Sequence, residues 1–163
     1  MEARMINRRT MLCLLTLPGL GLAALRAQAA DAPAPLKLGD AEWKKRLTPG
    51  QYAVLRGEGT EHAGTSPLND EKRAGTYHCA GCDLPLFSSA AKYDSGTGWP
   101  SFHAALPGAI NTKTDYKLIL PRTEYHCARC GGHQGHVFND GPAPTGKRYC
   151  NNGVALRFAP AEA

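Results

Sequence analysis

Two short cysteine repeats carry the strongest chemical signal in the chain. Tyr77-His78-Cys79-Ala80-Gly81-Cys82 returns as Tyr125-His126-Cys127-Ala128-Arg129-Cys130, with 44 residues between the two cysteine pairs. A two-residue spacer lets a tight turn aim two thiolates at one metal, and tetrahedral zinc takes four such ligands. Because four protein ligands leave no open coordination position, such a zinc would be structural. The repeat therefore predicts one structural Zn²⁺ held by Cys79, Cys82, Cys127 and Cys130.

Other interpretations of these cysteines remain open at the level of sequence. Each pair could form a redox dithiol or a disulfide in an oxidising compartment. Alternatively, His133 and His136 could replace one pair as metal ligands. Gly81 and Gly131 are expected to supply the backbone freedom that the two turns need.

Cys150 is left over once the two pairs and Cys13, in the N-terminal segment, are set aside. A single cysteine is more often a small buried residue than a nucleophile. Arg148 stands two positions earlier, on the same face of a strand, and His133 and His136 lie upstream. The guanidinium of Arg148 or a protonated histidine would stabilise a thiolate at Cys150. The residues alone leave a reactive thiol and a packed side chain as equal hypotheses.

The first 29 residues read as a secretion signal. Arg8-Arg9 precede an apolar run that ends at Leu25, and Ala27-Gln28-Ala29 has the small-residue pattern of a signal peptidase site. The paired arginines resemble a bacterial twin-arginine signal, with a general secretion signal as the alternative. The apolar run is short and contains proline and glycine, which disfavours a retained anchor. We expect a signal peptide at 1–29, a flexible Ala/Pro-rich lead-in at 30–39 and one domain at 40–163.

Composition limits the class of protein. The 163 residues are 42% hydrophobic and 20% charged, which excludes wholesale disorder and a fibrous chain. The 18 glycines and 12 prolines favour a turn-rich β or α+β domain over a helical bundle. The net charge of +5 comes largely from the first 29 residues, since 15 basic and 13 acidic residues remain without them. A nucleic-acid-binding function thereby loses its main support.

Local patterns predict helices near the start of the domain and strands after it. Asp40 is expected to cap a short helix through Leu47, and Thr48-Pro49 to begin a second helix. The polar stretch 57–75 reads as a surface loop. Short β-forming segments then lie between Gly/Pro turns, at 76–78, 115–120 and 149–158. These elements predict an antiparallel β domain.

Two longer segments resemble the methionine-R-sulfoxide reductase B family. Residues 92–102, Lys-Tyr-Asp-Ser-Gly-Thr-Gly-Trp-Pro-Ser-Phe, are similar to the central signature of the family, and residues 135–150, from Gly-His-Val-Phe to Arg-Tyr-Cys, to its second. The similarity covers about residues 40–159. It implies a mainly β (α+β) fold in which two small antiparallel sheets form a β-barrel or sandwich-like core. Short N-terminal helices and a structural zinc away from the active site would complete it.

The resemblance also implies a reaction, the thiol-dependent reduction of the R epimer of methionine sulfoxide in proteins and peptides. Cys150 would attack the sulfoxide sulfur, release methionine and become a sulfenic acid. His133 and His136 would polarise and protonate the sulfoxide oxygen. Asn152 would lie near that oxygen, and Arg148 would tune the thiolate.

The aromatic residues of the two segments would shape the substrate pocket. Trp99 would receive the methyl group of the substrate on its ring face, and Phe138 would help to line the pocket. Trp99 and Phe102 could instead be core aromatics, and for Phe102 the core is the expectation. Asp94, Ser95 and Asp140 are expected to brace loops.

The chain departs from the family pattern at a few positions. Thr97 stands where many members carry a second cysteine that resolves the sulfenic acid, so an external thiol is expected to reduce Cys150. Gln134 stands where leucine is usual. Asn151 and Gly153, on either side of Asn152, stand where an aliphatic residue and serine are usual.

The leading hypothesis is an exported oxidoreductase in the bacterial periplasm that repairs oxidised methionine. Its partners would be methionine-oxidised proteins or peptides and a thiol reductant, either a thioredoxin-like protein or a small thiol. No nucleic acid, no stable membrane anchor and a monomeric state are expected. The alternatives are a non-catalytic zinc-stapled β interaction module and a redox carrier that uses the Cys-x-x-Cys pairs.

Overall fold

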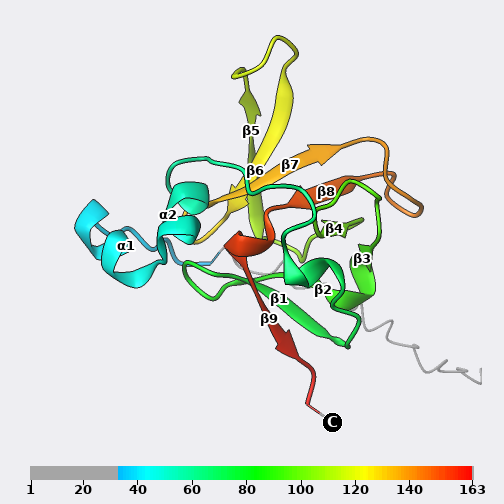
Figure 1. Cartoon of the computed structure of the whole chain (residues 1–163), viewed down its shortest axis with the longest axis horizontal. Coiled ribbons are helices and arrows are strands. Elements are labelled where there is room, and N and C mark those ends of the chain that lie inside the picture. Colours follow the sequence, from blue (N-terminus) through cyan, green and yellow to red (C-terminus); the bar gives the residue numbers. More distant parts are fainter. Residues whose placement is uncertain (1–32, 163) are drawn as a thin grey trace, which may run out of the picture.

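Two antiparallel sheets and two short helices make up the part of the chain that the structure describes, residues 33–162 of a computed structural model (Figure 1). The predicted signal peptide lies outside these residues. The helical elements are α1 (Asp40–Arg46), α2 (Pro49–Leu55) and the 3₁₀ turns η1 (Pro67–Asn69), η2 (Ser89–Ala91) and η3 (Gly153–Ala155). The strands are β1 (Gly75–Cys79), β2 (Pro85–Ser88), β3 (Lys92–Tyr93), β4 (Ser101–Phe102), β5 (Ile110–Asp115), β6 (Arg122–Cys127), β7 (His133–Phe138), β8 (Arg148–Asn151) and β9 (Leu156–Pro160).

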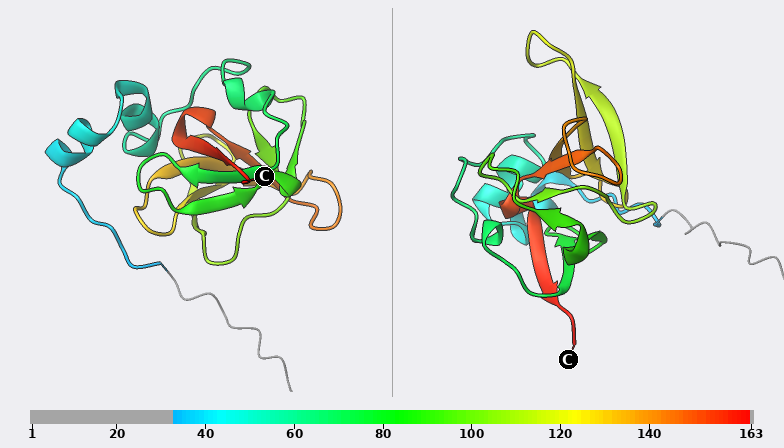
Figure 2. Two further views of the ribbon diagram at one scale, coloured as in Figure 1. Left: turned by 90° about the horizontal axis from the view of Figure 1, so that it is seen from below. Right: turned by 90° about the vertical axis from the view of Figure 1, so that its right-hand side faces the viewer.

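The predicted pair of antiparallel sheets is confirmed, but neither sheet closes into a barrel. The smaller sheet has the order β2-β1-β9, and the larger one has the order β3-β4-β8-β7-β6-β5. The right-hand view of Figure 2 shows the β5–β6 hairpin of the larger sheet standing out from the rest of the molecule. Because β8 lies inside the larger sheet, between β4 and β7, its residues are held by neighbours on both sides.

The N-terminal helices pack beside the cysteine turns. The predicted cap of α2 is confirmed, since the Thr48 hydroxyl accepts the backbone N–H of Gln51. The predicted cap of α1 is wrong, because Gly39 occupies that position and Asp40 is already the first helical residue. Trp43 and Leu55 are buried on these helices.

Two of the predicted strands are wrong in extent. The predicted 115–120 strand ends at its first residue, because the Asp115 carboxylate accepts the backbone N–H of Lys117 and turns the chain. The predicted 149–158 strand is divided into β8, η3 and β9. The Glu61 carboxylate accepts the N–H groups of Gly153 and Val154, so these groups are not available to a ladder. The chain therefore leaves the larger sheet after β8 and joins the smaller sheet as β9.

Aromatic side chains fill the space between the sheets. Phe87 stacks on Phe102 with ring centroids 4.3 Å apart, and Tyr77 meets Phe102 edge-on at 4.9 Å. All three are fully buried, which confirms the expectation that Phe102 belongs to the core. Among residues 33–162, none of the helices combines the length and the apolar character needed to cross a membrane.

Candidate active site and metal centre

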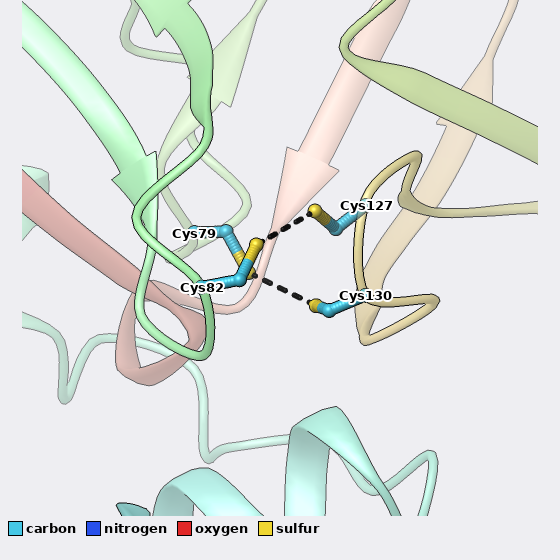
Figure 3. Close-up of side chains that lie close together, drawn as sticks. All are labelled: Cys79, Cys82, Cys127 and Cys130. Atoms are coloured by element: carbon cyan, nitrogen blue, oxygen red, sulfur yellow. Dashed lines mark hydrogen bonds between the residues drawn. The ribbon is translucent and has the colours of Figure 1, made fainter. Parts of the chain in front are cut away.

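The four paired cysteines converge on one point between the two sheets (Figure 3). All four thiols are buried, and their sulfur atoms lie within 4.8 Å of one another. Cys79 Sγ is 3.7 Å from Cys130 Sγ, and Cys82 Sγ is 3.4 Å from Cys127 Sγ. A tetrahedral metal with bonds of about 2.3 Å to sulfur needs sulfur atoms about 3.8 Å apart. The cluster therefore fits a four-thiolate metal site, as the repeat predicts.

The two turns that present these thiols have the same backbone geometry. Asp83 N–H donates to Cys79 O at 2.8 Å, and Gly131 N–H donates to Cys127 O at 2.9 Å. Both donors have left-handed backbone angles, with φ of 62° at Asp83 and 66° at Gly131. The expectation that Gly81 gives the first turn its freedom is wrong, because the left-handed residue is the one that follows the second cysteine of each pair. For Gly131 in the second turn the expectation is confirmed.

The alternative ligand sets do not fit this geometry. None of the five described cysteines is in a disulfide. The ring of His133 is engaged by Glu124 and that of His136 by Asp115, so neither histidine replaces a cysteine pair in the cluster.

A β-bulge in β7 places the two histidines together. His126 pairs with His133, whereas the preceding residue, Tyr125, pairs with Gly135, so Gln134 is an extra residue in β7. Residues three apart on a regular strand point to opposite faces. The extra residue reverses this alternation, so the side chains of His133 and His136 lie on the same face. Their ring centroids are 5.6 Å apart.

Strands β7 and β8 then bring His136 beside Cys150. The two residues are direct partners in the antiparallel pairing, and Ser101 of β4 is the partner of Cys150 on the other side. Directly opposed residues present their side chains on the same face of a sheet. Gly135 permits this close approach, since a Cβ atom there would lie 1.9 Å from the carbonyl oxygen of Cys150.

A small cavity of about 130 Å³ opens above Cys150. Ligand pockets for drug-sized molecules are typically about 300–1,000 Å³, so this cavity admits a single side chain. None of the four clustered cysteines lines it, and the candidate metal centre and the cavity are therefore separate sites. The lining residues are Thr60, Trp99, Arg122, Gly135, His136, Phe138, Cys150, Asn151 and Asn152.

Cys150 is the thiol of this cavity. Burial raises the pKa of Cys150 above its ordinary value, while the Thr97 hydroxyl and the positive charge of Arg148 oppose this effect. Thr97 Oγ1 lies 4.0 Å from Cys150 Sγ. Arg148 is held by two hydrogen bonds of 2.8 Å to Asp140, which therefore orients the cation. The free thiol is thus mainly protonated at neutral pH.

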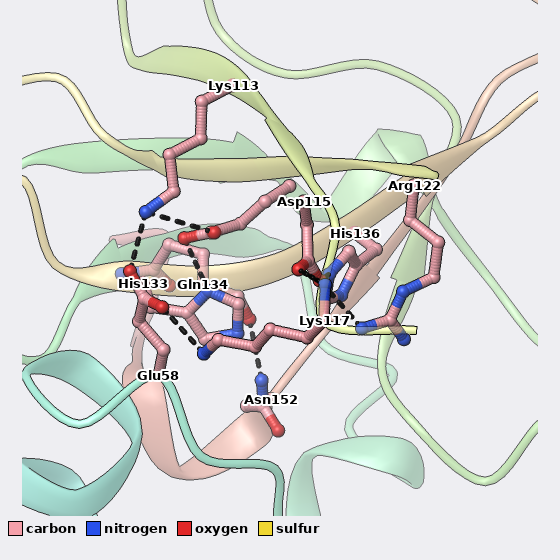
Figure 4. A network of polar contacts seen from close by, with 10 residues as sticks. Glu58, Lys113, Asp115, Lys117, Arg122, His133, Gln134, His136 and Asn152 are labelled. Atoms are coloured by element: carbon pink, nitrogen blue, oxygen red, sulfur yellow. Dashed lines mark hydrogen bonds and ion pairs between the residues drawn. The ribbon is translucent and has the colours of Figure 1, made fainter. Parts of the chain in front are cut away.

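The two histidines differ in their access to the cavity. Figure 4 shows His136 bound to Asp115 and His133 bound to a carboxylate on the neighbouring strand. His136 lines the cavity and its Nε2 lies 2.7 Å from Asp115 Oδ2. Burial lowers the pKa of His136, with Asp115 opposing the shift, so the ring is mainly neutral at pH 7. His133 is buried, lies 2.8 Å from Glu124 and does not line the cavity.

The remaining predicted residues surround the same cavity. The indole N–H of Trp99 donates to the backbone oxygen of Glu61 at 3.2 Å, which fixes the ring in the wall. Phe138 forms another part of the wall, and the guanidinium of Arg148 lies 4.3 Å from its ring centroid. Asn152 is buried, and its amide donates to the backbone oxygen of Gln134 at 3.0 Å.

Comparisons with known proteins show to which family the chain belongs. The SelR domain profile matches residues 47–160. The chain is 53% identical, over 74% of its length, to the peptide methionine sulfoxide reductase MsrB of Thiobacillus denitrificans, and the match covers 92% of that protein. The chain belongs to the methionine-R-sulfoxide reductase B family. It is also similar to two plant family members named peptide methionine sulfoxide reductase B1, chloroplastic, at 50% identity over 80% of the chain in Arabidopsis thaliana and 52% over 74% in Oryza sativa. The chain spans 65% and 57% of the lengths of these two plant proteins.

Gln134 and Asn151, two of the four positions named above as departures from the family pattern, meet inside the molecule. Gln134 and Asn151 are fully buried and in contact, with Asn151 Nδ2 3.4 Å from Gln134 Oε1. Tyr125 donates its hydroxyl to Asn151 Oδ1 at 2.7 Å, and Gln134 Nε2 lies 3.4 Å from Cys79 Sγ. Polar side chains thus connect the four-cysteine cluster to Asn151, the residue that follows Cys150.

Several residues of the site are missing from the sequence-based prediction. Asp115 and Glu124 hold the two histidines, and only the pairing of β5, β6 and β7 brings them there. Glu61 lies in a loop without regular structure and forms hydrogen bonds to Trp99, to Asn152 and to the η3 turn. No pattern of spacing around these residues indicates their positions.

Proposed function

We propose that this chain reduces the R epimer of methionine sulfoxide in proteins and peptides to methionine. The observation that carries the proposal is a thiol, Cys150, in the wall of a cavity of one side chain's size that Trp99, Phe138 and His136 also line. Membership in the family and the identity to proteins named as peptide methionine sulfoxide reductases support it. A non-catalytic interaction module would not require this combination of groups.

The chemistry balances within the cavity. The sulfur of Cys150 attacks the sulfoxide sulfur, the oxygen passes to Cys150, and the products are methionine and a Cys150 sulfenic acid. The thiol loses one proton and the departing oxygen gains one. A neutral imidazole suits this transfer because it can accept the proton and return it, and His136 is the imidazole in the cavity wall. Trp99 offers its ring to the methyl group of the substrate.

The second half of the cycle needs an external thiol. Thr97 is the residue whose side-chain oxygen lies 4.0 Å from Cys150 Sγ, and threonine cannot form a disulfide. If the other four described cysteines bind metal, none of them is free to react. A thioredoxin-like protein or a small thiol would attack the sulfenic acid, release water and form a mixed disulfide that a second thiol reduces. An intrachain Cys150 disulfide after one turnover, detected by mass spectrometry, would exclude this route.

We propose zinc as the metal of the four-cysteine cluster. The donor set of four thiolates and the spacing of the sulfur atoms match a closed tetrahedral site. Bound zinc would hold the β1–β2 turn to the β6–β7 turn and would have a structural role. Stoichiometric zinc bound by the four thiols would also exclude the redox-carrier hypothesis.

We propose export to the bacterial periplasm, based on the signal-like sequence of residues 1–29. A reporter fused behind these residues should be exported from the cytoplasm. Replacement of Arg8 and Arg9 by lysine should abolish export if the twin-arginine route is used. Export that persists in this variant would indicate the general secretion route, and no export of the original fusion would disprove the proposal.

The decisive experiment compares the two epimers of a blocked methionine sulfoxide with dithiothreitol as the reductant. The R epimer should be converted to the methionine derivative, whereas the S epimer should remain unchanged. The Cys150→Ser protein, loaded with metal and folded, is the matched control and should be inactive. No conversion of either epimer by the folded, metal-loaded protein would disprove the proposed function.

A further inference from the structure

The tip of the β5–β6 hairpin, residues 116–121, is an apolar surface next to the candidate active site. Within residues 33–162, the exposed large apolar side chains are Tyr116, Leu118, Ile119 and Leu120, and all of them lie in this tip. Ile119 is fully exposed. A cluster of this kind on a soluble domain marks a surface that contacts another molecule.

One side of the tip forms the wall of an open hollow of about 710 Å³. Residues 118–123 line it from the hairpin, and Val137, Phe138 and Asn139 line it from the end of β7. Arg122 and Phe138 line both this hollow and the cavity above Cys150. The two spaces are therefore neighbours that share a wall.

The base of the hairpin is tied to the candidate active site. Asp115, the last residue of β5, binds Arg122 at 2.7 Å and His136 at 2.7 Å. Lys117 forms an ion pair of 2.6 Å with Glu58, in the loop after α2. These contacts hold the apolar tip at a set position relative to Cys150.

We propose that the hollow binds the polypeptide segment on one side of the methionine sulfoxide, through apolar side chains of the substrate; this inference rests on the proposed function. The cavity of about 130 Å³ accommodates the sulfoxide side chain alone, so the residues next to it must lie outside. The hollow that shares Arg122 and Phe138 with the cavity is where such a segment continues. Its hairpin side presents Leu118, Ile119 and Leu120, which favour apolar partners.

Three substrates with dithiothreitol as the reductant test this proposal. They are a blocked methionine R-sulfoxide, a peptide with leucine and valine around the sulfoxide, and a peptide of equal length with serine and glycine there. The test variant is Ile119→Ser/Leu120→Ser. The matched control is Tyr116→Ser, since Tyr116 belongs to the same tip and is exposed but does not line the hollow.

The Ile119→Ser/Leu120→Ser variant should lose about tenfold in kcat/KM on the apolar peptide, because two apolar contacts are removed. Its kcat/KM on the blocked amino acid and on the polar peptide should stay within about twofold of the unsubstituted protein. Tyr116→Ser should behave like the unsubstituted protein on all three substrates. The melting temperature of both variants should be unchanged, because the replaced side chains are exposed.

Other outcomes would overturn the proposal. No loss on the apolar peptide, or an equal loss on all three substrates, would show that the tip does not bind the flanking segment. If the variant shows no loss with dithiothreitol but loses activity when the same assays are run with a thioredoxin as the reductant, the hollow would be assigned to the reductant instead. If the unsubstituted protein reduces none of the three substrates, the proposed function itself fails. This failure can be told apart from failure of the hollow proposal, in which the unsubstituted protein is still active.

Discussion

Replacement of Asn151 by leucine tests whether the buried polar contacts beside Cys150 act as a unit. Leucine has the branched shape of asparagine but can neither accept nor donate a hydrogen bond. The change removes the acceptor of the Tyr125 hydroxyl, 2.7 Å away, and the donor to Asn152 O, 2.8 Å away. Tyr125 and Asn151 are fully buried, so water cannot replace the lost partners.

The expected magnitudes follow from the number of buried groups left without a partner. Tyr125→Phe leaves Asn151 Oδ1 without its 2.7 Å partner and should cost about 1–2 kcal/mol of unfolding free energy. Asn151→Leu leaves the Tyr125 hydroxyl without its acceptor and Gln134 Oε1 without its 3.4 Å donor, whereas Asn152 O still accepts the Ala155 N–H at 3.0 Å. This variant should cost about 2–3 kcal/mol. The double variant has no Tyr125 hydroxyl left without a partner, so it should lose only about 2 kcal/mol of unfolding free energy. The coupling between the two residues should therefore be about 1–3 kcal/mol.

Urea unfolding of the four proteins, at one fixed free zinc concentration and under reducing conditions, measures this coupling. A fixed metal concentration is needed because a ligand that binds only the folded state adds to the apparent stability. Single-variant costs that add to within about 0.5 kcal/mol in the double variant would refute the reasoning. Additivity would mean that the Tyr125 and Asn151 side chains contribute independently, in spite of their short contact.

Three further predictions concern the thiols. Because burial raises the pKa of Cys150, its rate of alkylation by iodoacetamide should rise about tenfold per pH unit up to pH 9, as the thiolate fraction grows; a plateau reached below pH 8 would contradict this. Thr97→Cys should place a second thiol beside Cys150, so one turnover without reductant should leave an intrachain disulfide that peptide mapping detects; a persistent sulfenic acid, trapped by dimedone, would contradict it. Removal of the metal from Cys79, Cys82, Cys127 and Cys130 by a chelator should abolish the cooperative thermal transition or lower it by at least about 10 °C, because zinc binding energies of about 10–16 kcal/mol match the whole stability of a domain. An unchanged melting curve with metal loss confirmed by elemental analysis would show that the cluster is not a structural site.

Local sequence predicted those parts of the fold that depend on neighbouring residues. The Thr48-Pro49 start of α2 is confirmed because a capping hydroxyl and a proline act within one turn. The 115–120 and 149–158 strands are wrong because distant or side-chain groups compete for the backbone. Glu61, remote in sequence, takes the N–H groups of Gly153 and Val154 and ends the ladder there.

For the candidate site, the sequence by itself determined the residue types that can do chemistry. Two Cys-x-x-Cys turns of equal spacing predicted a common metal cluster, since each turn is a local structure that is closed by its own hydrogen bonds. The long segments around Trp99 and Cys150 indicated the family for the same reason, because a run of many specific residues needs no partner from elsewhere in the chain.

Only the tertiary structure decided which of these residues meet and what each one contacts. A bulge at Gln134 alters the alternation of β7 and brings the rings of His133 and His136 to 5.6 Å from each other, and of the two only His136 lines the cavity. Asp115 reaches His136 across strand pairings that spacing does not encode. Burial, finally, raises the pKa of Cys150 and lowers that of His136, and burial is a property of the packed molecule because it depends on how much water the surrounding strands exclude.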